Sequence, residues 1–261
     1  MTPSPSGKLH DRVALISGAG SGMGAAVAER FRAEGATVLA CGWPAAEVDE
    51  RPAALWTCDV RDDGQVRAAV DEALRRHGRI DVLVNAAGVI ASDGAASIDD
   101  AQWTRMHEVN LAGTMRMMRA VLPHMVARHG GSIVNIASVA AFNGSPESAS
   151  YAASKAGVVA LTRSAAHAYG TAGVRVNALC PGWVDTPMSR MEMHELALAL
   201  GVSEAEAHDR TVARIALGRM ARPDEMAAIC LFLASEESSF ITGVALVADG
   251  GSRMPATSRA V

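Results

Sequence analysis

The chain has 261 residues, of which 49% are hydrophobic and only 4% aromatic, and its formal net charge at pH 7 is −4. This length suits one large α/β domain that can bury a sizeable core. The small negative charge gives no reason to expect a nucleic acid or an anionic membrane as a partner. No apolar run approaches the roughly 18 residues that a membrane span requires.

Strand-like and helix-like stretches alternate along the chain. In chain order the sequence predicts a strand at 12–17, a helix at 22–34, strands at 37–41 and 54–58, a helix at 62–77, a strand at 80–84, a helix at 99–128, a strand at 132–137, a helix ending near 169, a strand at 174–179, a helical insertion at 188–214, a helix at 223–234 and a strand at 244–248. Such alternation is typical of βαβ units, so we expect a single-domain, doubly wound parallel sheet of seven strands with helices on both faces.

The domain boundaries follow from the same pattern. Residues 1–9 are expected to be a flexible lead-in, 10–255 the single domain, and 256–261 a tail. The insertion at 188–214 is rich in Met, Ala and Leu and breaks the alternation, so we interpret it as a helical lid over a substrate site.

A glycine-rich turn joins the first predicted strand to its helix, in the segment Ser17-Gly-Ala-Gly-Ser-Gly-Met-Gly24. Glycines let a backbone approach a pyrophosphate closely, and the N-terminus of the following helix offers free N–H groups. A lone glycine cluster is weak evidence. Between a buried strand and a helix in the first βα unit, it strongly indicates a dinucleotide site.

The cysteines and histidines give no sign of a metal site. Cys41, Cys58, Cys180 and Cys230 are scattered and share no C-x-x-C spacing, and the eight histidines include no H-x-x-x-H pair. We therefore expect no metal ion. Buried free thiols in a reducing cytoplasm are the better interpretation of the cysteines.

Tyr151 and Lys155 stand four residues apart on a predicted helix, with Ser138 after the preceding strand. Residues i and i+4 share a helix face, so the phenol and the ammonium would point into the same space. A nearby cation favours phenolate over phenol and would lower the tyrosine pKa towards neutrality. Taken alone, this spacing also suits a surface lysine beside a half-buried tyrosine.

The order of these motifs resembles the short-chain dehydrogenase/reductase family over nearly the whole chain. The glycine spacing Gly18-x-x-x-Gly22-x-Gly24 is the form that this family uses. Further matches follow in family order: Cys58-Asp59-Val60, Asn85-Ala86-Ala87-Gly88 with Ala86 in place of the second Asn, Asn110, Ser138, Tyr151, Lys155, Pro181-Gly182, Thr186, Thr242-Gly243 and Asp249-Gly250-Gly251.

The resemblance implies a Rossmann-like fold with a catalytic tetrad of Asn110, Ser138, Tyr151 and Lys155. It implies a cofactor site formed by Gly18, Ser21, Gly22, Met23, Gly24, Gly42, Trp43, Asp59, Val60, Asn85, Ala86, Ala87, Gly88, Tyr151, Lys155, Pro181, Gly182, Val184 and Thr186. Asp59 would bind the adenine amino group. Asn85 has an alternative structural role in joining two strands, and the Asp249 segment is expected to be a turn rather than a ligand.

The choice between NAD and NADP is expected to favour NAD. The acidic residue that would bind the ribose hydroxyls is missing, because Gly42 occupies its position, and Glu47 and Asp49 come later. The basic residue of NADP enzymes is also missing, since Ser21 and Trp43 occupy its two usual positions. Trp43 could lie against the adenosine or cover the short connection that follows it.

By resemblance, Ser138 would bind the substrate oxygen, Tyr151 would transfer the hydroxyl proton, Lys155 would lower the tyrosine pKa and hold the ribose, and Asn110 would anchor a water. The pocket is expected between Val139 and Pro146, Trp183 and the lid. Its predicted lining is Ser138, Ala140, Phe142, Tyr151, Trp183, Met188 and Met191. This lining favours a small, neutral, apolar secondary alcohol or ketone, although the methionines could equally be the buried face of the lid.

Three alternatives stay open at this point. One is an NADPH-dependent reductase resembling 3-oxoacyl-(acyl-carrier-protein) reductase. Another is a catalytically silent dinucleotide-binding regulator, against which the intact tetrad argues. The third is a different reaction on this fold, such as epimerisation or dehalogenation. The resemblance also implies a homotetramer.

Overall fold

A seven-stranded parallel sheet runs through the computed structural model, which describes residues 7–43, 55–143 and 147–252. The strand order is β3-β2-β1-β4-β5-β6-β7. The strands are β1 (Val13–Ser17), β2 (Thr37–Gly42), β3 (Leu55–Thr57), β4 (Val82–Asn85), β5 (Gly131–Ile136), β6 (Val174–Pro181) and β7 (Ala245–Ala248). The prediction of a doubly wound parallel sheet is therefore confirmed.

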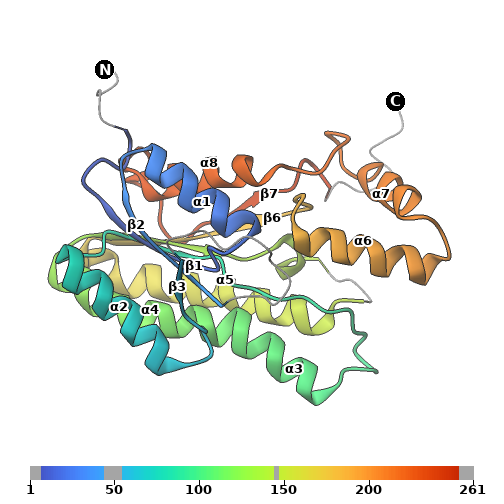
Figure 1. Cartoon of the computed structure of the whole chain (residues 1–261), viewed down its shortest axis with the longest axis horizontal. Coiled ribbons are helices and arrows are strands. Elements are labelled where there is room, and N and C mark those ends of the chain that lie inside the picture. Colours follow the sequence, from blue (N-terminus) through green and yellow to red (C-terminus); the bar gives the residue numbers. More distant parts are fainter. Residues whose placement is uncertain (1–6, 44–54, 144–146, 253–261) are drawn as a thin grey trace.

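Helices cover both faces of the sheet (Figure 1). The α-helices are α1 (Gly22–Ala33), α2 (Asp63–His77), α3 (Asp100–Met106), α4 (Gly113–Ala127), α5 (Ala149–Tyr169), α6 (Pro187–Leu200), α7 (Glu204–Val212) and α8 (Pro223–Ala234). Helices α1 and α8 form one layer, and α2, α4 and α5 form the other. Helices α6 and α7 stand beyond the carboxyl ends of the strands, where the sequence predicts the lid.

Each layer closes a hydrophobic core against the sheet. On the α1/α8 side, Val27, Phe31 and Leu231 pack against strand residues and are almost fully buried. On the other side, Val66 and Met117 do the same. The apolar faces of the amphipathic helices thus lie where their sequence spacing requires.

The predicted helix 99–128 is continuous but not uniformly α-helical. A π-helical segment, η1 (His107–Ala112), separates α3 from α4. π-segments insert a wide turn and often mark functional positions. This one carries Asn110, whose side chain is buried.

The predicted burial of the four cysteines is confirmed. Cys41, Cys58, Cys180 and Cys230 are free and buried. Within the part of the chain that the structure describes, no group of His, Cys, Asp or Glu side chains is suited to hold a metal ion. No described helix is long and apolar enough to cross a membrane.

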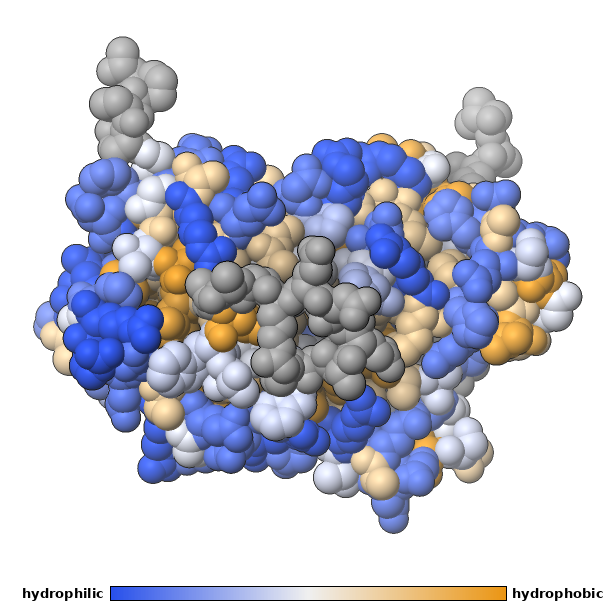
Figure 2. Space-filling view, viewed as in Figure 1, coloured by the Kyte–Doolittle hydropathy of each residue, from blue (hydrophilic) through white to orange (hydrophobic). Residues whose placement is uncertain are grey.

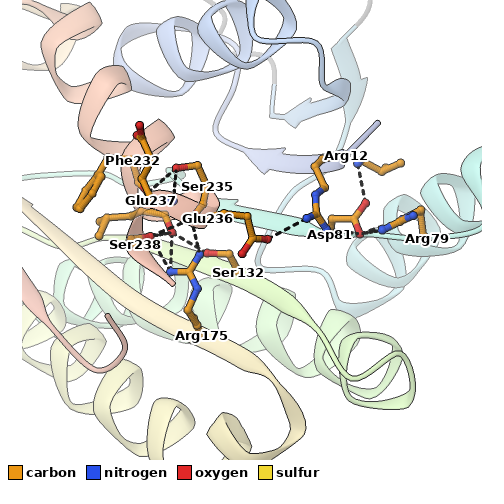
Figure 3. Close-up of polar contacts among 12 residues, drawn as sticks. Arg12, Arg79, Asp81, Ser132, Arg175, Phe232, Ser235, Glu236, Glu237 and Ser238 are labelled. Atoms are coloured by element: carbon orange, nitrogen blue, oxygen red, sulfur yellow. Dashed lines mark hydrogen bonds and ion pairs between the residues drawn. The ribbon is translucent and has the colours of Figure 1, made fainter. Parts of the chain in front are cut away.

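Polar contacts fasten the amino ends of the central strands (Figure 3). Arg175 on β6 donates to the carbonyl oxygens of Leu233 and Ser235, both at 3.0 Å, and to the Ser238 hydroxyl at 2.8 Å. These acceptors lie at and just beyond the end of α8, where helix carbonyls have no intrahelical partner. Arg175 therefore ties the last turn of α8 to the sheet.

We expect Arg175→Ala to lower the free energy of unfolding by about 2–4 kcal/mol, because it removes several hydrogen bonds donated by a partly buried, charged guanidinium. Urea denaturation followed by circular dichroism measures this change. The matched control is Arg222→Ala, which removes an exposed ion pair with Asp224 and should change stability by less than about 1 kcal/mol. Equal effects of the two substitutions would contradict the assigned role of Arg175.

Candidate active site

A groove of about 460 Å³ opens at the carboxyl ends of the central strands. Most of the predicted cofactor residues line it together: Gly18, Ser21, Gly22, Met23, Gly24, Gly42, Trp43, Asp59, Val60, Ala86, Ala87, Gly88 and Thr186. The crevice beyond the strand ends is where open α/β sheets bind their ligands. The remaining predicted cofactor residues, by contrast, do not line this groove: Asn85, Tyr151, Lys155, Pro181, Gly182 and Val184.

The close backbone packing of the glycine turn leaves no room for a side chain at two of its positions. A Cβ on Gly18 would lie 2.4 Å from the Ala87 nitrogen, and one on Gly24 would lie 2.2 Å from the Gly18 oxygen. Gly18 and Gly22 both have positive φ, +68° and +53°. No described side chain caps the N-terminus of α1 at Ser21, so its first N–H groups face the groove. This cradle fits a pyrophosphate group.

Asp59 and two arginines, Arg61 and Arg105, are among the residues that line the groove. Arg61 donates from both its Nε (3.0 Å) and its Nη2 (2.6 Å) to the Asp59 carboxylate, and its hydrogen bond holds the pKa of Asp59 below the ordinary value. Trp43 is 56% exposed. Sequence reasoning missed both Arg61 and Arg105, because neither lies at a position where the resemblance places a cofactor contact.

Ser138, Tyr151 and Lys155 lie close together between β5 and α5. The Ser138 hydroxyl lies close enough to the Tyr151 hydroxyl to lower the pKa of that phenol by hydrogen bonding. The Lys155 ammonium lies 5.7 Å from the centroid of the Tyr151 ring and donates to the Ile136 carbonyl at 2.9 Å. The predicted trio is thus assembled at one place by the end of one strand and one face of a helix.

The pKa of Tyr151 is opposite to the sequence expectation. Burial raises it to about 12, the hydrogen bond from Ser138 opposes this rise, and the charge of Glu192 adds to it. Burial also lowers the pKa of Lys155 to about 8. The expected lowering of the tyrosine pKa is therefore wrong, because desolvation dominates for both groups.

Asn110 is held rigidly by the segment that follows β4. Its Oδ1 accepts from the Val89 N–H at 2.8 Å, and its Nδ2 donates to the Val89 carbonyl and to Ser154 Oγ, both at 3.0 Å. A Cβ on Gly88 would lie 3.4 Å from Asn110 Oδ1 and 3.5 Å from Lys155 Nζ. Gly88 therefore keeps open the space in front of these two side chains.

The alternative structural role of Asn85 is confirmed. Asn85 pairs with Asn135 in the register of β4 and β5, and its Nδ2 donates to Asn135 Oδ1 at 2.8 Å. Asn135 in turn donates to Thr162 Oγ1 on α5 at 2.9 Å. Asn85 Oδ1 is buried without a hydrogen-bond partner among the described residues.

The segment around Pro181 and Gly182 packs against the C-terminal turn. A Cβ on Gly182 would lie 2.8 Å from the Asp249 Cβ. The Asp249 carboxylate accepts from the Gly251 N–H at 2.9 Å, so this segment is a turn, as the sequence indicates. Val184 is buried and pairs with Ala221. Thr186 caps α6 through a reciprocal hydrogen-bond pair with Ser189.

Asp93 is a buried residue that sequence reasoning missed. Its carboxylate accepts from the Ser150 N–H and hydroxyl and, at 3.1 Å, from Gln102 Nε2. Burial alone would raise the Asp93 pKa, but these hydrogen bonds outweigh it and leave the pKa lowered. Asp93 thereby fixes the first turn of α5, immediately before Tyr151. No local sequence signal identifies it, because the contact spans 57 positions.

Of the predicted substrate residues, Met188 lines the groove, and Ser138, Ala140, Phe142, Tyr151, Trp183 and Met191 do not. Ala140 and Phe142 belong to or adjoin the short turn η2 (Val139–Ala141), and Trp183 precedes the lid. Met188 is half-buried and lines the groove, whereas Met191 is 46% exposed. Pro146 lies outside the described residues. Glu192 on α6 was missed, although its charge acts directly on Tyr151.

The surface at the lid end is partly apolar, and Figure 2 shows hydrophobic side chains gathered where α6 and α7 lie. Leu198 and Leu200, near the end of α6, are among the exposed large apolar residues.

Comparison with known proteins agrees with this geometry. A family model described as enoyl-(acyl carrier protein) reductase matches residues 18–253. The 3-oxoacyl-(acyl-carrier-protein) reductase of Thermotoga maritima is 36% identical and is aligned over 94% of this chain and 98% of its own. The meso-2,3-butanediol dehydrogenase of Serratia marcescens is 40% identical over 94% of this chain and 95% of its own.

Solved structures lead to the same family. Aldohexose dehydrogenase of Thermoplasma acidophilum superposes with a TM-score of 0.86 at 35% identity, covering 95% of this chain and 96% of its own. Actinorhodin polyketide ketoreductase with NADPH gives the same TM-score at 36% identity, covering 92% and 97%. The chain therefore belongs to the short-chain dehydrogenase/reductase family of oxidoreductases.

Proposed function

We propose that the protein interconverts a secondary alcohol and a ketone with a nicotinamide dinucleotide, and that Tyr151 is its general acid and base. The observation that carries this proposal is the cluster of Ser138, Tyr151 and Lys155 next to Gly88, a residue of the groove. In oxidation, the Tyr151 phenolate takes the alcohol proton while the hydrogen on carbon leaves as hydride; in reduction, the tyrosine returns the proton. The bound nicotinamide supplies the hydride chemistry.

Ser138 and Lys155 have separate roles in this proposal. The Ser138 hydroxyl donates to the substrate oxygen as charge develops there. Lys155, held by the Ile136 carbonyl, faces the space that Gly88 leaves open and would bind the nicotinamide ribose. Asn110 fixes the Val89 segment beside that space and would anchor the water that links Lys155 to solvent. The cofactor itself would lie along the groove from the glycine turn to Asp59, as the resemblance implies.

We propose that the cofactor is NAD. Ser21 and Gly42 offer no cation, and Arg61 is already neutralised by Asp59, so the groove holds little net positive charge for a 2′-phosphate. Arg105 is the exception, because it lines the same groove with no ion pair to any residue that the structure describes.

The test is a fluorescence titration with NADH and NADPH in parallel. We expect NADH to bind at least about tenfold more tightly, and Arg105→Ala to leave the NADH affinity within about twofold. Tighter binding of NADPH, lost in Arg105→Ala, would contradict the NAD assignment and identify Arg105 as the phosphate contact. Binding of neither would contradict the enzymatic proposal as a whole.

We propose a small, neutral substrate, because the residues expected to line its pocket, Phe142, Trp183 and Met188, are apolar. The second candidate is reduction of a 3-oxoacyl thioester, which the Thermotoga maritima relative favours. Steady-state rates with short secondary alcohols and with 3-oxoacyl thioesters separate the two. We further propose a homotetramer in a reducing cytoplasm; light scattering of the purified protein measures the first property.

A further inference from the structure

One face of α6 borders the candidate active site. Met188, Glu192 and Glu195 are spaced i, i+4 and i+7 and therefore share that face. Met188 lines the cofactor groove. At the other end, Glu195 accepts a hydrogen bond from the Ser92 hydroxyl at 3.3 Å, and Ser92 belongs to the segment that follows β4. This face therefore extends from the cofactor groove to the segment that follows β4.

Glu192 lies between Met188 and Glu195 on this face. Its side chain is half-buried, and it has no hydrogen bond or ion pair with any residue in the described part of the chain. Ser92, which Glu195 contacts, adjoins Asp93, and Asp93 binds Ser150 immediately before Tyr151, so this part of α6 lies near the start of α5. The charge of Glu192 also raises the pKa of Tyr151. Burial, together with the neighbouring Glu195, raises the pKa of Glu192 to about 7.

A partly desolvated carboxyl without a partner is costly, and a hydrogen-bond donor from a ligand would relieve that cost. The ligand nearest to it is the molecule that Tyr151 deprotonates. We propose that Glu192 is a substrate-recognition residue that binds a second hydrogen-bond donor, a hydroxyl or a protonated amine, on a carbon close to the reacting one. This inference rests on the proposed alcohol–ketone chemistry and narrows its substrate from an apolar alcohol to a diol or an amino alcohol.

The ordinary alternative is a carboxyl that faces solvent at the rim of the lid. That alternative explains the neighbouring Met191, which is exposed, but does not explain a half-buried carboxyl that perturbs Tyr151. The two interpretations differ in whether Glu192 discriminates between substrates.

The test compares cyclohexanol, trans-1,2-cyclohexanediol and trans-2-aminocyclohexanol. We expect the wild-type protein to favour the diol over cyclohexanol in kcat/KM by about tenfold or more, the usual size of a hydrogen bond to a charged group. Glu192→Leu should abolish this ratio for both donors. Glu192→Gln, which keeps a carbonyl oxygen but no charge, should reduce the amine ratio more than the diol ratio. Glu204→Leu, which makes the same chemical change at an exposed position of α7, is the matched control and should leave both ratios within about twofold.

Binding distinguishes failure of this inference from failure of the proposed function. Calorimetric titration of the NADH-loaded protein gives the ratio of diol to cyclohexanol affinity without turnover. A ratio that is lost in Glu192→Leu supports the inference even if no alcohol is oxidised, an outcome that would contradict only the proposed reaction. A wild-type ratio near one, or a ratio unchanged in both Glu192 variants, overturns the inference.

Discussion

Replacing Tyr151 by Phe is expected to lower kcat by about 10²–10⁴-fold while leaving cofactor affinity within about threefold. The substitution removes the hydroxyl that exchanges a proton with the substrate and keeps the ring that fills the buried site. The ring that packs in the site is unchanged, so stability should not fall. Single-turnover absorbance of the reduced nicotinamide and a parallel NADH titration measure the two quantities.

The chain supplies a matched control for this experiment. Tyr169, at the end of α5, is its only other tyrosine and lies away from the groove. Tyr169→Phe makes the same chemical change on the same helix and should leave kcat within about twofold. If Tyr151→Phe kept more than about a tenth of the wild-type rate, another group would have to transfer the proton, and the assignment would be wrong.

The fold was largely predictable because its signals are local. Each buried strand is a short apolar run, and each helix has a clear start or an apolar stripe. The helix opened by Pro223 matches its prediction at both ends, and most strands differ by only one or two residues. The π-segment around Asn110 was not predictable, because its extra residue per turn leaves the apolar spacing on either side nearly intact.

The residues of the candidate site also differ in whether their signals are local. The glycine turn, Ser138, Tyr151 and Lys155 lie in short motifs that a single sequence reveals. Asp93 acts through a contact with a residue 57 positions away, and Glu192 acts through its charge on Tyr151. Nothing beside either residue in the sequence marks it as part of a site.

Electrostatics was the least predictable property of the site. The spacing of Tyr151 and Lys155 correctly places a cation near a phenol, but it carries no information on burial. Burial raises the pKa of one group and lowers that of the other. In this protein desolvation outweighs the attraction between phenolate and ammonium that the spacing suggests. A group that makes Tyr151 reactive must therefore lower its pKa against the effect of burial.

Ser138 is the group that does so in the protein alone, because its hydrogen bond is the influence that lowers the Tyr151 pKa. We therefore expect Ser138→Ala to have the second largest effect. The rate should fall by about 10²–10³-fold, as when a donor to a developing oxyanion is lost. The pH profile of alcohol oxidation should also move. Oxidation needs the phenolate, and removing the donor raises the tyrosine pKa further, so the rising limb shifts to higher pH.

Two variants decide whether this shift reports on Tyr151. Ser138→Thr keeps a hydroxyl. It should restore most of the rate, and the rising limb of its pH profile should lie at the wild-type pH. Glu192→Gln removes a negative charge that raises the Tyr151 pKa, so its limb should move to lower pH, opposite to Ser138→Ala. A structural disturbance of the site would lower both rates without moving the two limbs in opposite directions. Opposite shifts would place the hydroxyl of Ser138 and the carboxyl of Glu192 on either side of one titrating phenol.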